Sequence, residues 1–260
     1  MKSKKVIQFH SFKGGTGKSV LAISLAVWLS QQGYKVLIID GDLSAPSLDK
    51  LIEPSIQSPE TWLDYLESRS KLENIIHQTF VSNLSVIYAP NPRIKHRIAA
   101  QSNEWGRNTL KQILIAKKHL LTELEYDFVL IDNENGLGIN SLNNIACSDV
   151  SFLVVRPAKH GFLGSIHLLQ EIYTAMPDDW NQQCYLIWNQ VPKNPGMNHI
   201  TEDLLSKWNK QFEGVGIKTV GKIDYNSKFA IELLKEEEKQ IISVFEEIQY
   251  FMGKILQEIL

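Results

Sequence analysis

The sequence predicts an α/β fold in which a mostly parallel sheet carries helices on both faces. Short apolar runs alternate with helix-length amphipathic stretches along the chain. The apolar runs are nearly continuous rather than broken by alternate polar residues, as expected of strands that are covered on both sides. Strands that alternate with helices favour parallel pairing. No internal repeat, low-complexity segment or linker interrupts this order, so residues 1–260 are interpreted as one domain.

The expected elements follow one another in a regular order. The expected strands are 6–12, 35–40, 84–90, 127–132, 149–157, 184–191 and 217–223. The expected helices lie near 18–32, 60–68, 104–125, 138–147, 161–176, 201–213 and 225–237. The stretch 241–260 is predicted to form a last helix, because its apolar residues recur at alternating spacings of four and three and form one stripe. That stripe consists of Ile241, Phe245, Ile248, Met252, Ile255 and Ile259.

The composition favours a cytoplasmic protein. The chain has 260 residues, 43% hydrophobic and 22% charged, which is enough to form a core without a disulfide or a metal. Cys147 and Cys184 are far apart and form no CxxC pair, which suits a reducing compartment and argues against a zinc or iron–sulfur site. The basic start "MKSKK" is followed by a segment too short and too polar for an export signal. The net charge of −2 produces no general attraction to nucleic acid.

The stretch "SFKGGTGKS" (11–19) lies between an expected strand and an expected helix, which is the context of a phosphate-binding loop and of the P-loop NTPase fold. Its glycines let backbone N–H groups turn toward phosphate oxygens, and the helix N-terminus adds partial positive charge. Lys18 is expected to reach the β- and γ-phosphates of a nucleotide, and the Ser19 hydroxyl is placed to bind Mg²⁺. The strict Walker A pattern has glycine where Phe12 stands, so this loop is a variant. The residues expected to contact the nucleotide here are Gly14, Gly15, Thr16, Gly17, Lys18, Ser19 and Val20.

A second lysine, Lys13, is the distinctive feature of this loop. With its KGGxGK[ST] pattern, the sequence resembles the deviant Walker A ATPases of the MinD/ParA group, and the resemblance covers nearly the whole chain. It implies ATP and Mg²⁺ as cofactors. It also implies an ATP-dependent homodimer in which Lys13 contacts the phosphates held by the partner chain and acts in catalysis together with Lys18. A lysine beside a phosphate site can also act within one chain, and the residues alone leave this alternative open.

Aspartates end two of the expected strands. Asp40 and Asp42 follow "KVLII", and two carboxylates spaced by two residues point the same way, toward the crevice at the strand ends. Asp132 ends "DFVLI", which corresponds to the Walker B strand of the family. The resemblance implies that Asp40 and Asp132 belong to the metal site with Ser19, and that Asp42 orients the attacking water. For the Asp40–Asp42 pair, a role in a turn or helix cap is the alternative.

The residues after Asp132 depart from the family pattern. The family usually continues with threonine or serine and then prolines before the glycine, whereas this chain has Asn133, Glu134 and Asn135. The two rigid prolines are therefore absent. Glu134 is interpreted as a polar loop residue that points to solvent, with an additional base for the attacking water as the alternative.

Two later segments resemble the base-binding segments of the family. In "LIWNQVPKN", Asn189 is expected to bond adenine, because its amide offers both an acceptor and a donor. In "VGKIDYNSKFAIELL", Asp224 is expected near the base, although Ile223 stands where the family has proline.

Membrane binding is not expected from the last helix. The face opposite its apolar stripe carries Glu246, Glu247 and Glu258 against Lys254, and anionic lipids attract basic faces instead. A helix that packs on the sheet is the favoured interpretation. The basic stretch "PRIKHR" (92–97) is interpreted as a solvated loop, with DNA binding as the alternative.

The resulting functional hypothesis is a slow ATPase, stimulated by an unidentified protein activator or cargo, that acts as an ATP-dependent dimerisation switch in positioning or partitioning a cellular cargo. One alternative is an ATP-dependent metabolic enzyme on the same scaffold, similar to dethiobiotin synthetase. Another is a scaffold that binds ATP without hydrolysing it. ATP turnover separates the switch from the scaffold, and a lysine-dependent ATP dimer separates it from most metabolic enzymes.

Overall fold

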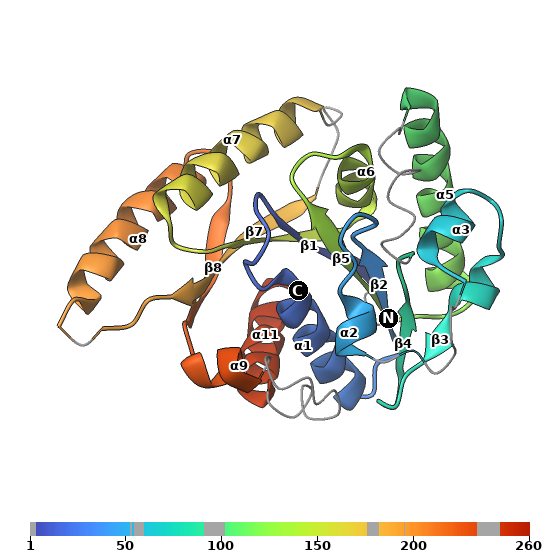
Figure 1. Ribbon diagram of the computed structural model, residues 1–260, viewed down its shortest axis with the longest axis horizontal. Helices are drawn as coiled ribbons and strands as arrows, with labels where there is room; N and C mark the ends of the chain where they lie inside the picture. Colours follow the sequence, from blue (N-terminus) through green and yellow to red (C-terminus); the bar gives the residue numbers. More distant parts are fainter. Residues whose placement is uncertain are drawn as a thin grey trace.

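The fold is a single eight-stranded sheet with helices on both sides (Figure 1). The computed structural model describes residues 4–52, 54, 60–90, 102–175, 182–194, 196–232 and 245–260. The strand order is β3-β4-β2-β5-β1-β6-β7-β8. Neighbouring strands pair in parallel, except for the antiparallel pair β3 and β4. The predicted fold class, a mostly parallel α/β sheet, is confirmed.

The strands lie close to their predicted positions. They are β1 (Lys5–Ser11), β2 (Val36–Gly41), β3 (His77–Gln78), β4 (Leu84–Ile87), β5 (Phe128–Asn135), β6 (Val150–Val155), β7 (Gln183–Val191) and β8 (Lys218–Asp224). The sequence did not predict β3, because two residues are too few to show a period. β4 ends before its predicted end at residue 90, whereas β5 continues beyond its predicted end at residue 132 and pairs Asn135 with Ser11 of β1.

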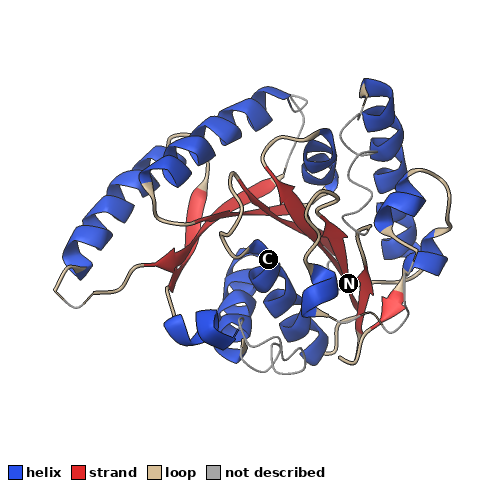
Figure 2. Ribbon diagram, in the orientation of Figure 1, coloured by secondary structure: helices blue, strands red, loops and turns tan. Residues whose placement is uncertain are grey.

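The helices form two layers. They are α1 (Lys18–Gln31), α2 (Leu48–Leu51), α3 (Trp62–Leu66), α5 (Asn103–Thr122), α6 (Ile139–Cys147), α7 (Lys159–Ala175), α8 (Asn198–Glu213), α9 (Ser227–Glu232) and α11 (Glu246–Ile259). Figure 2 shows α1, α2, α9 and α11 on one face of the sheet and the others on the opposite face. The single turn α2 was not predicted, and the predicted helix 225–237 continues into residues 233–237, which lie outside the described residues.

The two layers explain the continuous apolar runs of the central strands. In β2, Val36 and Ile38 pack into the core beneath α1, whereas Leu37 and Ile39 pack into the core beneath α3 and α5. All four side chains are at most 2% exposed. Because successive strand residues point to opposite faces, a strand covered on both faces needs apolar residues at every position.

The last helix, α11, packs against α1. Of its predicted stripe, Phe245, Ile248, Met252 and Ile255 are buried, and Ile241 lies outside the described residues. Gly253 faces Trp28 of α1 so closely that a Cβ atom there would collide with the indole ring. The predicted closing helix is thus present, and its apolar stripe is part of the core. None of the helices in the described ranges combines the length and the apolar character that crossing a bilayer requires.

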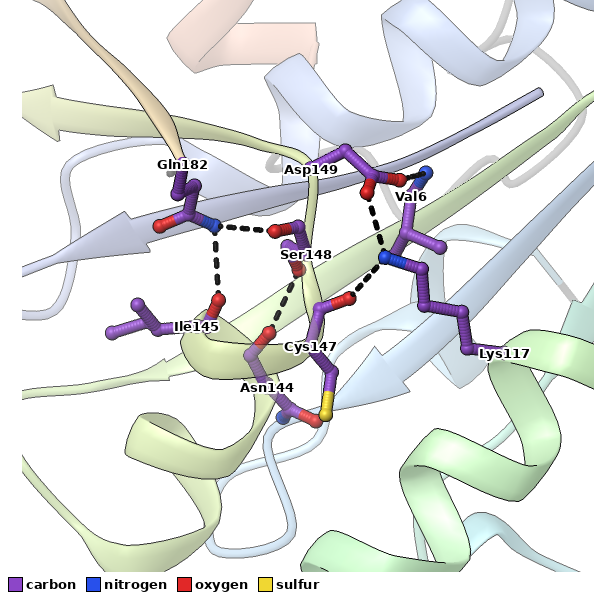
Figure 3. Close-up of polar contacts among 8 residues, drawn as sticks. All are labelled: Val6, Lys117, Asn144, Ile145, Cys147, Ser148, Asp149 and Gln182. Atoms are coloured by element: carbon purple, nitrogen blue, oxygen red, sulfur yellow. Dashed lines mark hydrogen bonds and ion pairs between the residues drawn. The ribbon is translucent and has the colours of Figure 1, made fainter. Parts of the chain in front are cut away.

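A cluster of hydrogen bonds and an ion pair connects the C-terminal end of α6 to α5 and β1 (Figure 3). Lys117 of α5 donates to the Cys147 carbonyl over 2.9 Å and forms an ion pair with Asp149 over 2.6 Å. Asp149 also accepts a hydrogen bond from the Val6 backbone, and Gln182 donates to the carbonyls of Ile145 and Ser148. Carbonyls at the end of a helix have no partner within it, so these side chains satisfy them and orient α6.

Candidate functional site

The loop between β1 and α1 has the backbone geometry of a phosphate cradle. Gly15 and Gly17 have φ angles of 76° and 89°, a left-handed conformation that favours glycine. Gly17 also lies against the Asn189 side chain, which leaves no room for a Cβ atom. The loop leads directly into the N-terminus of α1, so its N–H groups and the helix dipole face the same region. The predicted strand–loop–helix context is present.

Phe12 departs from the Walker A pattern for a packing reason. Its ring lies against Gly164 of α7, at a distance that excludes a Cβ atom on that glycine. It also packs onto the core formed by α7, α8 and the neighbouring strands. A glycine at this position would lose the apolar contact that attaches the loop to α7.

The two lysines of the loop have opposite environments. Lys18 is 7% exposed, and its Nζ donates to Asn135 Oδ1 over 2.8 Å. Lys13 is exposed, and the described residues provide no hydrogen bond or ion pair for its ammonium group. Lys18 is therefore held by β5 of the same chain, whereas the ammonium group of Lys13 has no partner among the described residues.

Ser19, Ser47 and Asp132 line the position expected for a metal ion. Ser19 Oγ lies 2.9 Å from Ser47 Oγ, which donates to Asp132 Oδ2 over 3.4 Å. The other carboxylate oxygen, Asp132 Oδ1, is buried and has no hydrogen-bond partner among the described residues. A buried acceptor of this kind needs a ligand. One carboxylate and two hydroxyl groups fit Mg²⁺, which binds few carboxylates and takes phosphate and water as further ligands. In the described parts of the chain no three His, Cys, Asp or Glu side chains form a metal cluster.

Asp40 is buried beside Asp132 and organises the turn after β2. Its Oδ2 accepts hydrogen bonds from the backbone N–H groups of Ser47 and Leu48, each over 3.0 Å. Burial, followed by the nearby Asp132 carboxylate, raises the pKa of Asp40 to about 8. Burial also raises the pKa of Asp132, against the lowering effect of the Lys18 ammonium. A divalent cation beside these carboxyl groups would favour their ionised forms.

Asp42 is also buried near the loop, at 7% exposed. Its Oδ1 accepts from the backbone N–H groups of Ser44 and Ala45, over 3.1 Å and 2.7 Å. This pattern makes the carboxylate a turn cap. The second oxygen, Oδ2, accepts no hydrogen bond from the described residues, and the role of Asp42 in orienting a water molecule stays a prediction.

Glu134 corrects one expectation. It is 8% exposed, so the interpretation as a solvent-pointing residue is wrong. Its Oε1 accepts from the Ser141 N–H in the first turn of α6, and Gly138 leaves the space that the carboxylate fills. Burial raises the pKa of Glu134 to about 7, against the lowering effect of the Ser141 N–H. This carboxylate therefore fixes the start of α6.

Asn133 takes the place of the family's threonine or serine and is fully buried. Its Nδ2 donates to Gln8 of β1 over 3.1 Å and to the Ser141 carbonyl over 3.1 Å, and its Oδ1 accepts from Asn144 over 3.0 Å. These bonds connect β5, β1 and α6. They restrain the segment that the prolines of the family would have restrained.

The expected base-binding residues lie on β7 and β8. Asn189 is buried, and its Nδ2 donates to the Thr16 carbonyl of the loop over 2.7 Å, so its contact with adenine stays a prediction. Asp224 lies 3.3 Å from Lys193 Nζ, on a cavity of about 460 Å³ that Tyr225 and Phe251 also line. Within the described residues, no hydrogen bond joins Asp224 to the phosphate loop. Val20 is partly buried and packs against the core beneath α1.

Sequence reasoning missed Asn135, Ser47 and Gln190 as site residues. Asn135 contacts Lys18, Ser47 contacts Ser19, and Gln190 Nε2 donates to the Gly15 carbonyl over 3.1 Å. Ser47 and Gln190 belong to no spaced motif. The sequence shows that Asn135 differs from the family pattern, but it does not show that this residue lies near the phosphate loop. That position follows from the strand register, in which Asn135 pairs with Ser11.

Comparison with known proteins agrees with this geometry. A family model described as an AAA domain matches residues 4–184. The chromosome-partitioning ATPase Soj of Treponema pallidum is 29% identical over 168 residues, which cover 65% of this chain and 63% of the relative. The chain spans about half to two thirds of the length of these curated relatives.

Two solved structures have the same fold. An ATP complex of McdA from Cyanothece superposes with a TM-score of 0.77 at 17% identity, over 99% of this chain and 98% of that chain. The septum site-determining protein MinD of Pyrococcus horikoshii, complexed with Mg-ADP, superposes with a TM-score of 0.64 at 20% identity, over 97% and 98%. These comparisons agree with the two-lysine phosphate loop and with the buried aspartates at the strand ends. The chain belongs to this AAA-domain family and is of the MinD/ParA P-loop type.

Proposed function

We propose that this chain binds ATP with Mg²⁺, hydrolyses it slowly, and uses bound ATP to join two copies into a homodimer. In this proposal Lys18 holds the phosphates within each chain, and Lys13 reaches those of the partner chain. Ser19 and Asp132 hold the Mg²⁺ ion, with Asp40 behind them, and the ion neutralises phosphate charge when bound. Asp42 orients the attacking water, and Asn189 and Asp224 hold the base.

The contrast between Lys13 and Lys18 carries the proposal. A lysine that serves its own nucleotide is expected to turn inward and find an acceptor, as Lys18 does. Lys13 lies five positions earlier on the same loop, is exposed and has no acceptor among the described residues. A cation without an acceptor at the edge of a phosphate site is well placed to bind the phosphate groups of a second molecule. A second copy of this chain with bound ATP is the simplest such partner.

The relatives support the cellular role. Soj is named a chromosome-partitioning ATPase, and MinD a septum site-determining protein. By analogy, this chain acts in the cytoplasm to position or partition a cargo, and a protein activator or the cargo itself stimulates hydrolysis. DNA is a weaker candidate partner. The stretch 92–97 that suggested DNA lies outside the described residues.

The deciding experiment measures mass by light scattering, with ATP and with ADP. It uses Asp42→Ala, so that hydrolysis does not dissolve the dimer, and compares it with Asp42→Ala/Lys13→Ala. We expect Asp42→Ala to double its mass with ATP only, and the double variant to stay a monomer while it still binds ATP. A double variant that also doubles its mass would show that Lys13 acts within one chain. A wild-type dimer that never releases phosphate would make the protein an ATP-held scaffold.

A further inference from the structure

Asn135 places a carboxamide at the mouth of the phosphate loop. It is the last residue of β5, where it pairs with Ser11 of β1, and the Gly136 N–H donates to the Ser11 carbonyl over 3.0 Å. Its Oδ1 lies 2.8 Å from Lys18 Nζ and 2.8 Å from Ser11 Oγ. The side chain is therefore held from both sides by the strand and the loop.

The contact with Lys18 fixes the orientation of this carboxamide. A lysine ammonium only donates hydrogen bonds, so the amide oxygen must face it and the NH₂ group must face away. That NH₂ group lies beside Gly14, because a Cβ atom built on Gly14 would be 3.5 Å from Asn135 Nδ2. Asn135 is only partly buried, and no described residue accepts a hydrogen bond from its Nδ2. Two N–H donors are thus presented, without an acceptor, next to the exposed Gly14 and Gly15.

We propose that Asn135 is a further phosphate-binding residue of this site, whose Nδ2 donates to the terminal phosphate of a nucleoside triphosphate. The inference rests on the proposed binding of ATP. The residue acts at both ends: Oδ1 holds Lys18 at the loop without neutralising its charge, and Nδ2 adds a donor that a diphosphate does not engage.

The chemistry favours a neutral amide at this position. A carboxylate would form an ion pair with Lys18 and repel phosphate oxygens. The proline that the family has nearby would offer no donor at all. A donor aimed at a ligand group lets a site reject the analogue that lacks that group, because the donor is then left unpaired. Asn135 therefore makes this site prefer a triphosphate to a diphosphate.

The test is calorimetric binding of ADP and of the nonhydrolysable analogue AMP-PNP, both with Mg²⁺, at protein concentrations where the chain stays a monomer. The variants are Asn135→Ala, which removes both ends of the amide, and Asn135→Asp, which keeps the acceptor for Lys18 and loses the donor. The matched control is Asn198→Asp on α8. Asn198 Oδ1 accepts from the Asn194 N–H, so this change adds the same charge and keeps that bond.

We expect the preference for AMP-PNP over ADP to fall about 10-fold in Asn135→Ala and further in Asn135→Asp, as for the loss of one charge-assisted hydrogen bond. Asn198→Asp keeps the wild-type ratio. Ratios within twofold of wild type in both Asn135 variants would overturn the role of Asn135 while leaving ATP binding intact. A wild-type protein that binds neither nucleotide would instead overturn the proposed function. A ratio readout is insensitive to a general loss of folded protein, which affects both ligands equally.

Discussion

Asp40 of β2 is the register partner of Asp132 of β5, and both carboxyl groups are buried. Two buried carboxyl groups on adjacent strands repel each other when both are ionised. The pKa of Asp40 is accordingly raised to about 8, first by burial and then by Asp132. Both effects favour the protonated carboxyl group of Asp40, whereas a bound cation would favour its ionised form.

Binding of Mg²⁺ with ADP is expected to release a proton from this pair at pH 7. The sign follows from the pKa of Asp40: the group is mostly protonated at pH 7, and a nearby cation favours the ionised form, so the proton leaves. Calorimetry in two buffers of different ionisation enthalpy measures the number of protons released. Asp40→Asn serves as the control for protons that come from the nucleotide. Equal release by the variant and the wild type would rule out Asp40 as the source.

Lys18→Ala is expected to lose most of its affinity for Mg-ATP. The residue supplies the buried ammonium of the loop, and hydrogen bonds to charged groups contribute about 1.5–3 kcal/mol each. Titration with a fluorescent ATP analogue measures the loss. Lys13→Ala, which removes the exposed lysine of the same loop, is the control and is expected to retain the ATP affinity of the monomer. Unchanged affinity in Lys18→Ala would be incompatible with the phosphate-loop assignment.

Asp42→Ala is expected to bind ATP and to lose hydrolysis by about 10²-fold or more, the usual range for a residue that orients or activates a reacting water. Phosphate release under single-turnover conditions provides the rate. Asp42 also caps the turn by accepting from the N–H groups of Ser44 and Ala45. Asp42→Asn is therefore the matched variant, because the amide oxygen can keep those bonds while the substitution removes the negative charge. If both variants hydrolyse ATP normally, the water is oriented elsewhere, and Glu134→Gln is the next variant to measure.

Gly253→Val is expected to destabilise the protein by about 1–3 kcal/mol, the typical result of forcing extra atoms into a packed core. The new side chain would collide with Trp28 and separate α11 from α1. Urea unfolding monitored by tryptophan fluorescence measures the change in free energy of unfolding. Gln257→Val, at an exposed position of the same helix, controls for the β-branched residue. A similar small effect in both variants would mean that α11 is loosely attached.

Acidic vesicles are expected to bind this chain weakly. The apolar stripe of α11 is buried against α1, and the exposed side of the helix carries Glu246, Glu247 and Glu258. Sedimentation with vesicles that contain anionic lipid measures binding, and neutral vesicles are the control. Strong sedimentation that is confined to anionic vesicles would overturn this expectation.

The fold could be predicted because its signals are local. Apolar runs such as that of β2 are continuous in the sequence, and the phosphate loop is a contiguous motif. The elements that escaped prediction are β3, α2 and the 3₁₀ helix Leu72–Ile75, each of which is too short to show a period.

The candidate site could be predicted only in part. Lys13, Lys18 and Asp132 belong to recognisable motifs. The contact between Asn135 and Lys18 depends on strand register, which joins residues that are far apart in the sequence. The burial of Glu134 depends on the small Gly138 at the start of α6, and no pattern in one segment reveals it.

The contact between α1 and α11 has a consequence for synthesis on the ribosome. The helix α1, which carries Lys18, is synthesised more than 200 residues before α11, which covers its Trp28 face. Contacts between distant segments close late, because loop closure costs entropy before the contact stabilises the fold. Until α11 has been synthesised, one apolar side of α1 is uncovered, and this exposed surface makes the growing chain prone to aggregation.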